Sequence, residues 1–459
     1  MSIHLLTDFL RSLCWEDIPK PIQRRTRLLL LDLLGTGLAG TGTKLHRIVT
    51  DYACRHLGSG RARVPFTNRF ASPEGAAMAG GMTIDAVDAH DGHRLTKGHV
   101  GCAVLPTLLA LLDDTEAPMT GEGFLTLLTA GYEIGTRAGI ALHATAPDYH
   151  TSGAWNAVTC AALAAHILAL DGERFAHALG IAEYHGPRSQ MMRGVDHPTM
   201  VKDGSGWGAL AGVSAAYLAQ AGFTGAPALT IMDPALSNLW STLGSTWETA
   251  NQYIKGFPVC RWAQPAVQAA LDLAATHSLS AQDVEEVRIA TFHQAVRLFS
   301  GVPETTEQAQ YAITFPVAAA LVRGQVGLPE ILPTAFADLE IRRIVERTRL
   351  EEDKDLTALF PAERWARVHL RTRSGQEMNA PLTQARGDLE TPYGDREIIE
   401  KFHQLAGHVA DRERLTRIER AVFDLDNGRA SLEALQAEIF AVTSPECSDL
   451  LPESVPLRE

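Results

Sequence analysis

Apolar side chains recur every three or four residues along most of the first 270 residues of the chain. That spacing places them on one face of a helix, so it predicts a series of helices. The segments with this pattern are residues 25–38, 76–86, 104–112, 122–141, 156–170 and 207–221. No segment here alternates apolar and polar residues as a strand would. Alanine and glycine also recur at helical spacing, as in residues 130–139, which predicts helices that pack closely.

The pattern changes after about residue 270. Residues 284–292 and 366–373 alternate apolar and polar side chains, as half-buried strands do. A Ser-Gly turn then leads into a predicted return strand at residues 377–382. Helical spacing resumes at residues 395–406 and 432–442.

These patterns predict a mainly α fold in three parts. A large all-helical domain spans residues 1–269, and a smaller α+β domain spans residues 270–392. The C-terminal helices, within residues 393–459, are expected to return and pack on the helical domain. A chain of 459 residues is long enough for more than one core, which fits this division.

Composition narrows the possible partners. The net charge of −13 is spread along the chain without a basic block, so nucleic acid is not expected as a partner. The most apolar early run, residues 28–40, contains an aspartate and three glycines, and a bilayer span needs about 20 apolar residues. The six cysteines form no CxxC pair, and the first residues do not resemble a secretory signal. We therefore expect a soluble cytoplasmic protein with reduced thiols and no membrane partner.

Residues 85–99 contain three carboxylates, three imidazoles and a lysine between two apolar segments. Burying such groups unpaired costs several kcal/mol, so this cluster is expected to line a polar pocket. A second interpretation is a metal-dependent hydrolase, because His90 and His93 are three residues apart with Asp88 and Asp91 interleaved. Capping of the adjacent helices would explain only one or two of these seven residues.

Three further stretches each precede a predicted helix. His150 lies where it would face a ligand at a helix N-terminus, although Thr151 and Ser152 beside it are readily explained as helix caps. Lys202 precedes a glycine loop whose backbone amides suit a carboxylate, and no preceding strand supports a nucleotide fingerprint there. In the third stretch, which contains Lys255, Arg261 can clamp a carboxylate or form a structural ion pair.

In this order and spacing, the motifs resemble those of the MmgE/PrpD family, which includes 2-methylcitrate dehydratase, cis-aconitate decarboxylase and iminodisuccinate epimerase. Residues 88–93, Asp-Ala-His-Asp-Gly-His, followed by His-Val-Gly at 99–101, are similar to the family's Asp-x-Asp-Asp-x-His and His-Pro-Gly pattern. His-Thr-Ser-Gly at 150–153 and Ala-Gln-Ala-Gly-Phe-Thr-Gly at 219–225 are similar to two further family motifs.

The resemblance implies a helical domain with a smaller α+β lid, a homodimer, and chemistry without a cofactor or metal beside a carboxylate. The residues predicted to be catalytic are His99, Lys202, His150 and Asp88. Those predicted to bind substrate are Asp91, His93, Lys255 and Arg261. Two departures from the family pattern are His90, where an aspartate is usual, and Phe315, where the decarboxylase branch has a tyrosine.

The implied chemistry begins with removal of a proton α to a carboxylate. His99 or His150 is the candidate base, and Lys202, Lys255 and Arg261 are the cations available to stabilise the resulting charge. The leading expectation is a hydro-lyase similar to 2-methylcitrate dehydratase, acting on a small polycarboxylate. The alternatives are an epimerase of an iminodisuccinate-like compound and a cis-aconitate-type decarboxylase, although the missing hydroxyl at Phe315 argues against assuming the latter. Two flanking bases would favour epimerisation, whereas one base and one acid would favour elimination.

Overall fold

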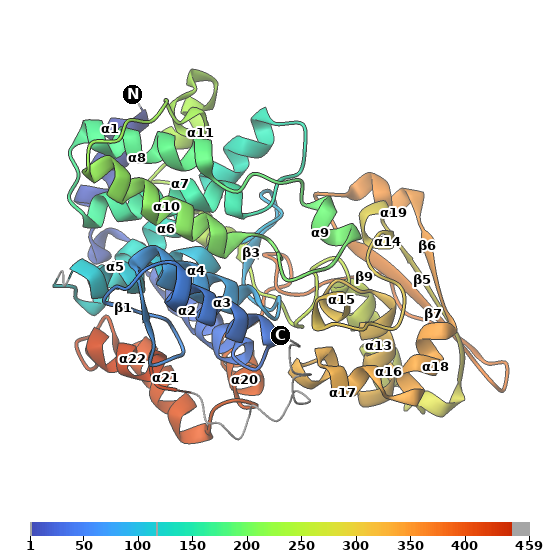
Figure 1. Ribbon diagram of the computed structural model, residues 1–459. Helices are drawn as coiled ribbons and strands as arrows, with labels where there is room; N and C mark the ends of the chain where they lie inside the picture. Colours follow the sequence, from blue (N-terminus) through green and yellow to red (C-terminus); the bar gives the residue numbers. More distant parts are fainter. Residues whose placement is uncertain (1, 116–117, 443–459) are drawn as a thin grey trace, which may run out of the picture.

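The computed structural model describes residues 2–115 and 118–442, and its fold is mainly α, as predicted (Figure 1). The helices of the first part are α1 (Ser2–Ser12), α2 (Lys20–Gly40), α3 (Lys44–His56), α4 (Pro73–Asp85), α5 (Gly101–Thr115), α6 (Gly121–Thr145), α7 (Gly153–Ile167), α8 (Gly172–His185), α9 (Met192–Asp196), α10 (Ser205–Gln220), α11 (Leu229–Met232) and α12 (Ser237–Ser241). Each of the six helices predicted before residue 270 overlaps one of these. None of the helices in the described part of the chain has the length and apolar content needed to cross a bilayer.

Small residues allow the central helices to pack closely. Gly212 on α10 faces the backbone of α7, and a methyl group added there would overlap the carbonyl oxygen of Ala157. The backbones of α7 and α10 therefore approach more closely than larger side chains would permit. This confirms the packing predicted from the spacing of alanine and glycine.

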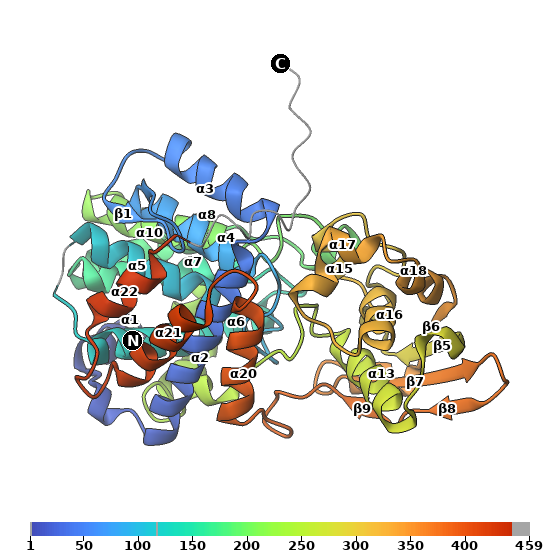
Figure 2. The ribbon, with the colours of Figure 1, turned by 90° about the horizontal axis from the view of Figure 1, so that it is seen from below.

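The second part of the chain contains a five-stranded sheet covered by helices (Figure 2). Its strands are β5 (Val284–Thr291), β6 (Thr348–Glu352), β7 (Trp365–Thr372), β8 (Glu377–Asn379) and β9 (Thr383–Gln384). β5 is parallel to β6 and antiparallel to β7, which also pairs with β8 and β9. The helices here are α13 (Gln264–His277), α14 (His293–Val296), α15 (Thr306–Gln310), α16 (Thr314–Arg323), α17 (Pro333–Phe336), α18 (Leu339–Glu346) and α19 (Lys354–Leu359). Of these, α13, α14, α16 and α18 contact the sheet.

The three predicted strands are confirmed as β5, β7 and β8, whereas β6 and β9 were not predicted. The expectation of no strand before residue 270 was wrong in detail. β1 (Ala62–Arg63) pairs with β2 (Phe70–Ala71), and β3 (Gly92–His93) pairs with β4 (Gln252–Tyr253). Each has only two residues, so none is long enough to show an alternating pattern.

The C-terminal helices return to the first part of the chain. They are α20 (Asp395–Ala406), α21 (Arg412–Asp424) and α22 (Leu432–Ile439), and α20 packs along α2 (Figure 2). Lys401 of α20 is buried, and its ammonium lies 2.5 Å from a carboxylate oxygen of Asp32 on α2. Two apolar cores result: one joins the early helices to the C-terminal ones, and the other lies mainly within residues 259–378. The two domain boundaries expected from sequence, after residues 269 and 392, remain predictions.

Candidate active site

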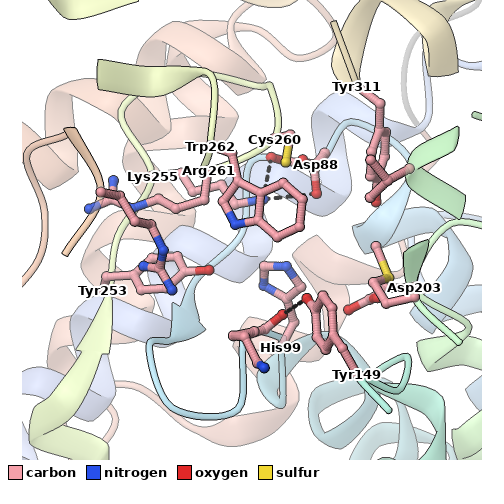
Figure 3. A pocket seen from close by; sticks show the side chains of 14 residues that line it. Asp88, His99, Tyr149, Asp203, Tyr253, Lys255, Cys260, Arg261, Trp262 and Tyr311 are labelled. Atoms are coloured by element: carbon pink, nitrogen blue, oxygen red, sulfur yellow. Dashed lines mark hydrogen bonds and ion pairs between the residues drawn. The ribbon is translucent and has the colours of Figure 1, made fainter. Parts of the chain in front are cut away.

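A pocket with about 410 Å³ of empty space, including space open to solvent, lies where the two parts of the molecule meet (Figure 3). It is lined by Asp88, Lys97, His99, Tyr149, Met191, Val195, Asp203, Tyr253, Lys255, Cys260, Arg261, Trp262, Tyr311 and Arg364. These residues come from widely separated segments, with most of them in loops rather than in regular helices or strands. Four of the eight predicted site residues are among them: Asp88, His99, Lys255 and Arg261.

The loop from β3 to His99 is held by close backbone contacts. The amide of His93 donates to the carbonyl of Gly98 over 2.9 Å, and Lys97 adopts a left-handed backbone with a φ of 52°. A side chain at Gly98 would overlap Ser152 and Trp155 at the start of α7. Only glycine fits there, so the loop delivers His99 to the pocket in a defined position.

His99 is held as a neutral imidazole. Its Nδ1 donates to the backbone carbonyl of Asp91, because a carbonyl oxygen can only accept, and this leaves the lone pair on Nε2. Nε2 makes no hydrogen bond with any residue that the structure describes. Burial, followed by the charge of Lys255, lowers the pKa of His99 to about 3. The imidazole is therefore unprotonated at neutral pH and can accept a proton.

Asp88 and Lys255 form a buried ion pair beside His99. The ammonium of Lys255 lies 2.8 Å from Oδ1 of Asp88 and also donates to the Asp88 carbonyl over 3.0 Å. Burial opposes the charge of Lys255, but Asp88, together with Tyr253 and Cys260, raises the pKa of the lysine. Asp88 has a left-handed φ of 50°, which is a strained conformation for a residue other than glycine. The pair thus places a fixed positive charge in the wall of the pocket.

Asp203 lines the pocket but was not predicted as a site residue. The Ser152 hydroxyl donates to its Oδ2, whereas its Oδ1 is buried without a hydrogen-bond partner in the described ranges. Burial, followed by repulsion from Asp85, raises the pKa of Asp203 to about 7. Near neutral pH this carboxyl group can therefore donate a proton. Its position next to Lys202 was the only signal in the sequence that pointed to it.

A phenol also lines the pocket, although not at the expected position. Phe315 is buried on α16, with its ring centroid 5.5 Å from that of Phe336, and does not line the pocket. Tyr311, four residues earlier and directly after α15, does line it. The hydroxyl missing at Phe315 therefore does not leave the pocket without a phenol.

The other four predicted residues lie outside the pocket lining. Lys202 donates to the side chain of Gln310, and its ammonium lies 4.8 Å from the ring centroid of Tyr311. His150 stacks beside His143, with 6.5 Å between ring centroids. Its chain neighbour Tyr149 lines the pocket instead.

Asp91 and His93 face the helical part of the molecule. Tyr132 donates to Oδ2 of Asp91 over 2.7 Å, and burial raises the pKa of this carboxyl to about 7. Nε2 of His93 lies 3.4 Å from a carboxylate oxygen of Glu248. Only the backbone of Asp91 reaches the site, through its carbonyl bond to His99.

Two arginines line the pocket, and they differ in how they are bound. Arg261 has its guanidinium 2.5 Å from Asp388 and donates 2.7 Å to the carbonyl of Arg386. Arg364 is buried, yet Nε and one terminal nitrogen have no hydrogen-bond partner within residues 2–115 and 118–442. Sequence reasoning missed Arg364, because no motif marks it; its only signal was its place just before a predicted strand.

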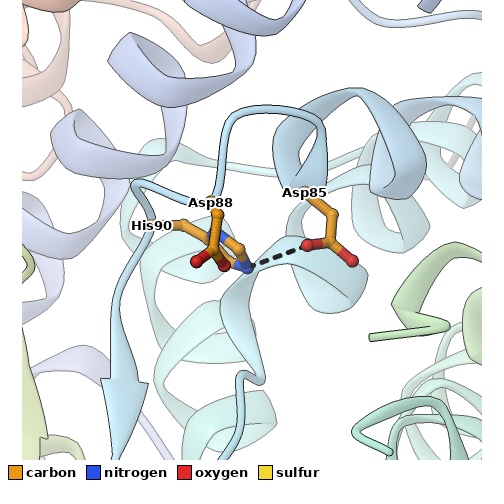
Figure 4. A group of neighbouring side chains, drawn as sticks. All are labelled: Asp85, Asp88 and His90. Atoms are coloured by element: carbon orange, nitrogen blue, oxygen red, sulfur yellow. Dashed lines mark ion pairs between the residues drawn. The ribbon is translucent and has the colours of Figure 1, made fainter. Parts of the chain in front are cut away.

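Asp85, Asp88 and His90 lie close together behind the pocket, with one possible ligand atom from each within 4.8 Å of the others (Figure 4). All three are buried, and neither ring nitrogen of His90 has a hydrogen-bond partner among the described residues. However, Asp88 is already neutralised by Lys255, and burial, followed by the charges of His99, Lys255, Lys202 and Lys401, lowers the pKa of His90. The nearby lysine charges would repel a divalent cation, which disfavours the metal-dependent hydrolase.

Two family models match the chain. The model described as the MmgE/PrpD N-terminal domain matches residues 4–234, and the one described as the MmgE/PrpD C-terminal domain matches residues 257–426. The cis-aconitate decarboxylase-like protein oryM of Aspergillus oryzae is 24% identical, over 94% of this chain and 95% of its own length. The cis-aconitate decarboxylase of Aspergillus terreus is 23% identical, over 90% and 91%, and the human one is 22% identical, over 88% and 87%.

Proposed function

The chain belongs to the MmgE/PrpD family, and from that premise we propose that it is a lyase that removes a proton α to a carboxylate of a small polycarboxylate and expels a β-hydroxyl. In this proposal the reaction is carried by the side chains of the pocket, with no cofactor. The observation that supports it most directly is the neutral His99, whose Nε2 has no hydrogen-bond partner in the described ranges and lies in a pocket that two lysines and two arginines also line.

His99 is proposed as the base. Its low pKa in the empty pocket makes it a weak one, but the negative charge of a bound substrate would raise that pKa and strengthen it. Lys255 lies close enough to lower the pKa of His99, so it can also stabilise the charge that spreads onto the substrate carboxylate. Asp88 holds Lys255 in place for this role.

Asp203 is proposed as the acid that makes elimination possible. His99 takes the Cα proton, the electron pair forms the carbon–carbon double bond, and the β-hydroxyl leaves with a proton from Asp203 as water. A carboxyl group with a pKa of about 7 is suited to this step. Two bases on opposite faces of the substrate would instead favour epimerisation. His150, the candidate for the second base, does not line the pocket.

Decarboxylation is the second candidate. The relatives above are named cis-aconitate decarboxylases, at low identity, and Tyr311 provides a phenol that could protonate the carbanion left by loss of carbon dioxide. The same pocket and the same cations would serve that reaction.

NMR spectroscopy of reactions run in deuterated water tests these proposals. The protein is incubated separately with 2-methylcitrate, cis-aconitate and iminodisuccinate. Loss of water from 2-methylcitrate is the expected result, and loss of carbon dioxide from cis-aconitate would instead establish the second candidate. If no acid reacts or exchanges its Cα proton for deuterium, the lyase proposal fails.

Chelator treatment separates the lyase from the metal-dependent hydrolase. Turnover is expected to survive treatment with EDTA and removal of the chelator by dialysis. Activity that disappears on treatment and returns only with added divalent metal would support the hydrolase instead.

A further inference from the structure

Two cations in the pocket have no acidic partner among the residues that the structure describes. The charge of Lys255 is balanced by Asp88, and that of Arg261 by Asp388. Neither Arg364 nor Lys97 forms an ion pair with any residue in the described part of the chain. An uncompensated charge away from water is costly, so the pocket is built for an anion that supplies the missing partner.

Arg364 is the more deeply buried of these two cations. Its side chain is only 4% exposed, and both Nε and Nη1 are buried without partners among the described residues. Nη2 donates to the backbone carbonyl of Arg94 over 3.3 Å, which anchors one side of the guanidinium and leaves the other side unpaired. Asp388 acts on Arg364 from a distance, but it is bound to Arg261.

Lys97 adds a second positive charge. It is half-buried, and its ammonium lies 4.6 Å from the ring centroid of Tyr149, with no hydrogen bond to the described residues. Burial, followed by repulsion from Arg364, lowers the pKa of Lys97. The two cations therefore act on each other, and an anion bound between them would relieve that repulsion.

We propose that Arg364 and Lys97 bind a carboxylate of the substrate other than the one beside the reacting carbon, so that the site selects acids with at least two carboxylates. This rests on the proposed function for the reacting carboxylate, which lies at Lys255 and His99. Arg364 comes from the segment leading into β7, and Lys97 comes from the loop after β3, so the substrate bridges the two parts of the molecule. Arg364 and Lys97 are thus specificity residues.

Calorimetric binding of an acid that cannot be dehydrated tests the proposal. Propane-1,2,3-tricarboxylate carries three carboxylates and no hydroxyl, and butanoate carries one carboxylate. The variants are Arg364→Gln, Arg364→Lys and Lys97→Gln. The control is Arg367→Gln, because Arg367 lies on β7 itself, is half-exposed, and pairs with Asp353 outside the pocket.

We expect Arg364→Gln to weaken tricarboxylate binding by about 10- to 100-fold, since one charge-assisted bidentate contact is lost. Arg364→Lys keeps the charge but not the planar guanidinium that binds a carboxylate through two nitrogens. The loss of tricarboxylate affinity is therefore expected to be smaller. Lys97→Gln is expected to weaken binding by about 3- to 10-fold because its site is only half-buried. Butanoate binding should change little in each variant, and Arg367→Gln should match the wild type for both acids.

Wild-type tricarboxylate affinity in both Arg364→Gln and Lys97→Gln would overturn the proposal. So would a failure of the wild type to bind the tricarboxylate, or an equal loss of affinity for the tricarboxylate and for butanoate. Circular dichroism confirms that each variant is folded, and Lys97→Gln, at a half-buried position, keeps the test valid if Arg364→Gln does not fold. Selective binding without turnover of any acid would defeat the proposed function alone, whereas normal turnover with an unchanged KM in Arg364→Gln would defeat this inference alone.

Discussion

His99 is held through its backbone as well as through its ring. Its amide donates to the Ser152 hydroxyl over 2.9 Å, and its carbonyl accepts from the side chain of Asn156 over 2.9 Å. These contacts do not depend on the imidazole. A substitution at this position is therefore expected to alter the chemistry of the pocket more than its shape.

His99→Ala is predicted to lower kcat by about 100- to 10,000-fold, which is the usual contribution of a general base. The measurement is turnover of the acid that the NMR experiment identifies, with circular dichroism to establish folding. His166→Ala is the control, because His166 lies at the far end of α7 and does not line the pocket. Turnover near the wild-type rate in His99→Ala would exclude His99 as the base.

The buried carboxyl of Asp91 makes the free energy of unfolding fall as pH rises. Burial raises its pKa to about 7 from an ordinary value of 3.8, so the folded protein retains a proton that the unfolded chain releases above about pH 4. Between these values the folded state binds more protons, and the free energy of unfolding falls as pH rises. Buried histidines with lowered pKa values act in the opposite direction, but mainly below about pH 6.5.

We predict that Asp91→Asn reduces the fall in the free energy of unfolding between pH 5 and 7. The amide cannot lose a proton, yet its oxygen can still accept from Tyr132, so at most about 1.4 kcal/mol per pH unit of the slope is removed. Urea unfolding at both pH values measures this. Asp51→Asn is the control, because Asp51 is half-exposed and its pKa is lowered by its hydrogen bond with Arg69. Parallel slopes in Asp91→Asn and the wild type would refute the prediction.

At the scale of elements, periodicity predicted the long helices because each has a buried face that repeats over several turns. It also predicted β5, β7 and β8, where one face is buried and the other is exposed. It did not predict β3 and β4, because the pairing of Gly92 with Tyr253 depends on tertiary contact across the chain rather than on local pattern. Short elements of this kind shape the pocket, so part of the site was beyond the reach of local patterns.

The backbone just after α7 has a conformation that is unusual for alanine. Ala169, just after this helix, adopts a left-handed backbone with a φ of 52°, which glycine tolerates better than alanine. Ala169→Gly is therefore expected to raise the free energy of unfolding by about 0.5–1 kcal/mol, measured by urea denaturation. Ala176→Gly, inside α8, should lower it by about 1 kcal/mol. Destabilisation by both substitutions would contradict the assigned conformation at Ala169.

At the scale of the whole molecule, the Asp32–Lys401 ion pair joins the start of the chain to its C-terminal helices. Lys401 also donates 2.6 Å to the carbonyl of Ala89, directly before His90. Lys401→Ala would leave Asp32 buried without its partner, so it is predicted to lower the free energy of unfolding by about 3–5 kcal/mol.

The double variant Asp32→Asn with Lys401→Met tests this assignment. It removes both charges and should recover most of the stability lost in Lys401→Ala, as measured by the same urea titration. If the double variant is as unstable as Lys401→Ala, the loss does not come from the unpaired Asp32.

The homodimer also remains a prediction at this scale, and light scattering of the purified protein measures its mass in solution.

The pocket shows how far sequence could predict the site. The cluster at residues 85–99 was predicted to line a polar pocket, and Asp88 and His99 do so. Asp91 and His93 share that segment, but Asp91 accepts from Tyr132 and His93 lies beside Glu248, both in the helical part. No sequence motif marks Asp203 or Arg364. They line the pocket only because the two parts of the molecule pack against each other there.

The Asp88–Lys255 pair also has a consequence for synthesis of the protein. The two residues are 167 positions apart, and Arg364 follows later still. On the ribosome, Asp88 and His99 emerge long before the lysine and arginine that complete their surroundings. A nascent chain that stops short of residue 255 therefore has Asp88, Lys97 and His99 but lacks Lys255 and both arginines of the pocket. Ligand can stabilise the protein only after almost four-fifths of the chain has been made, so the helical part must reach its fold without that help.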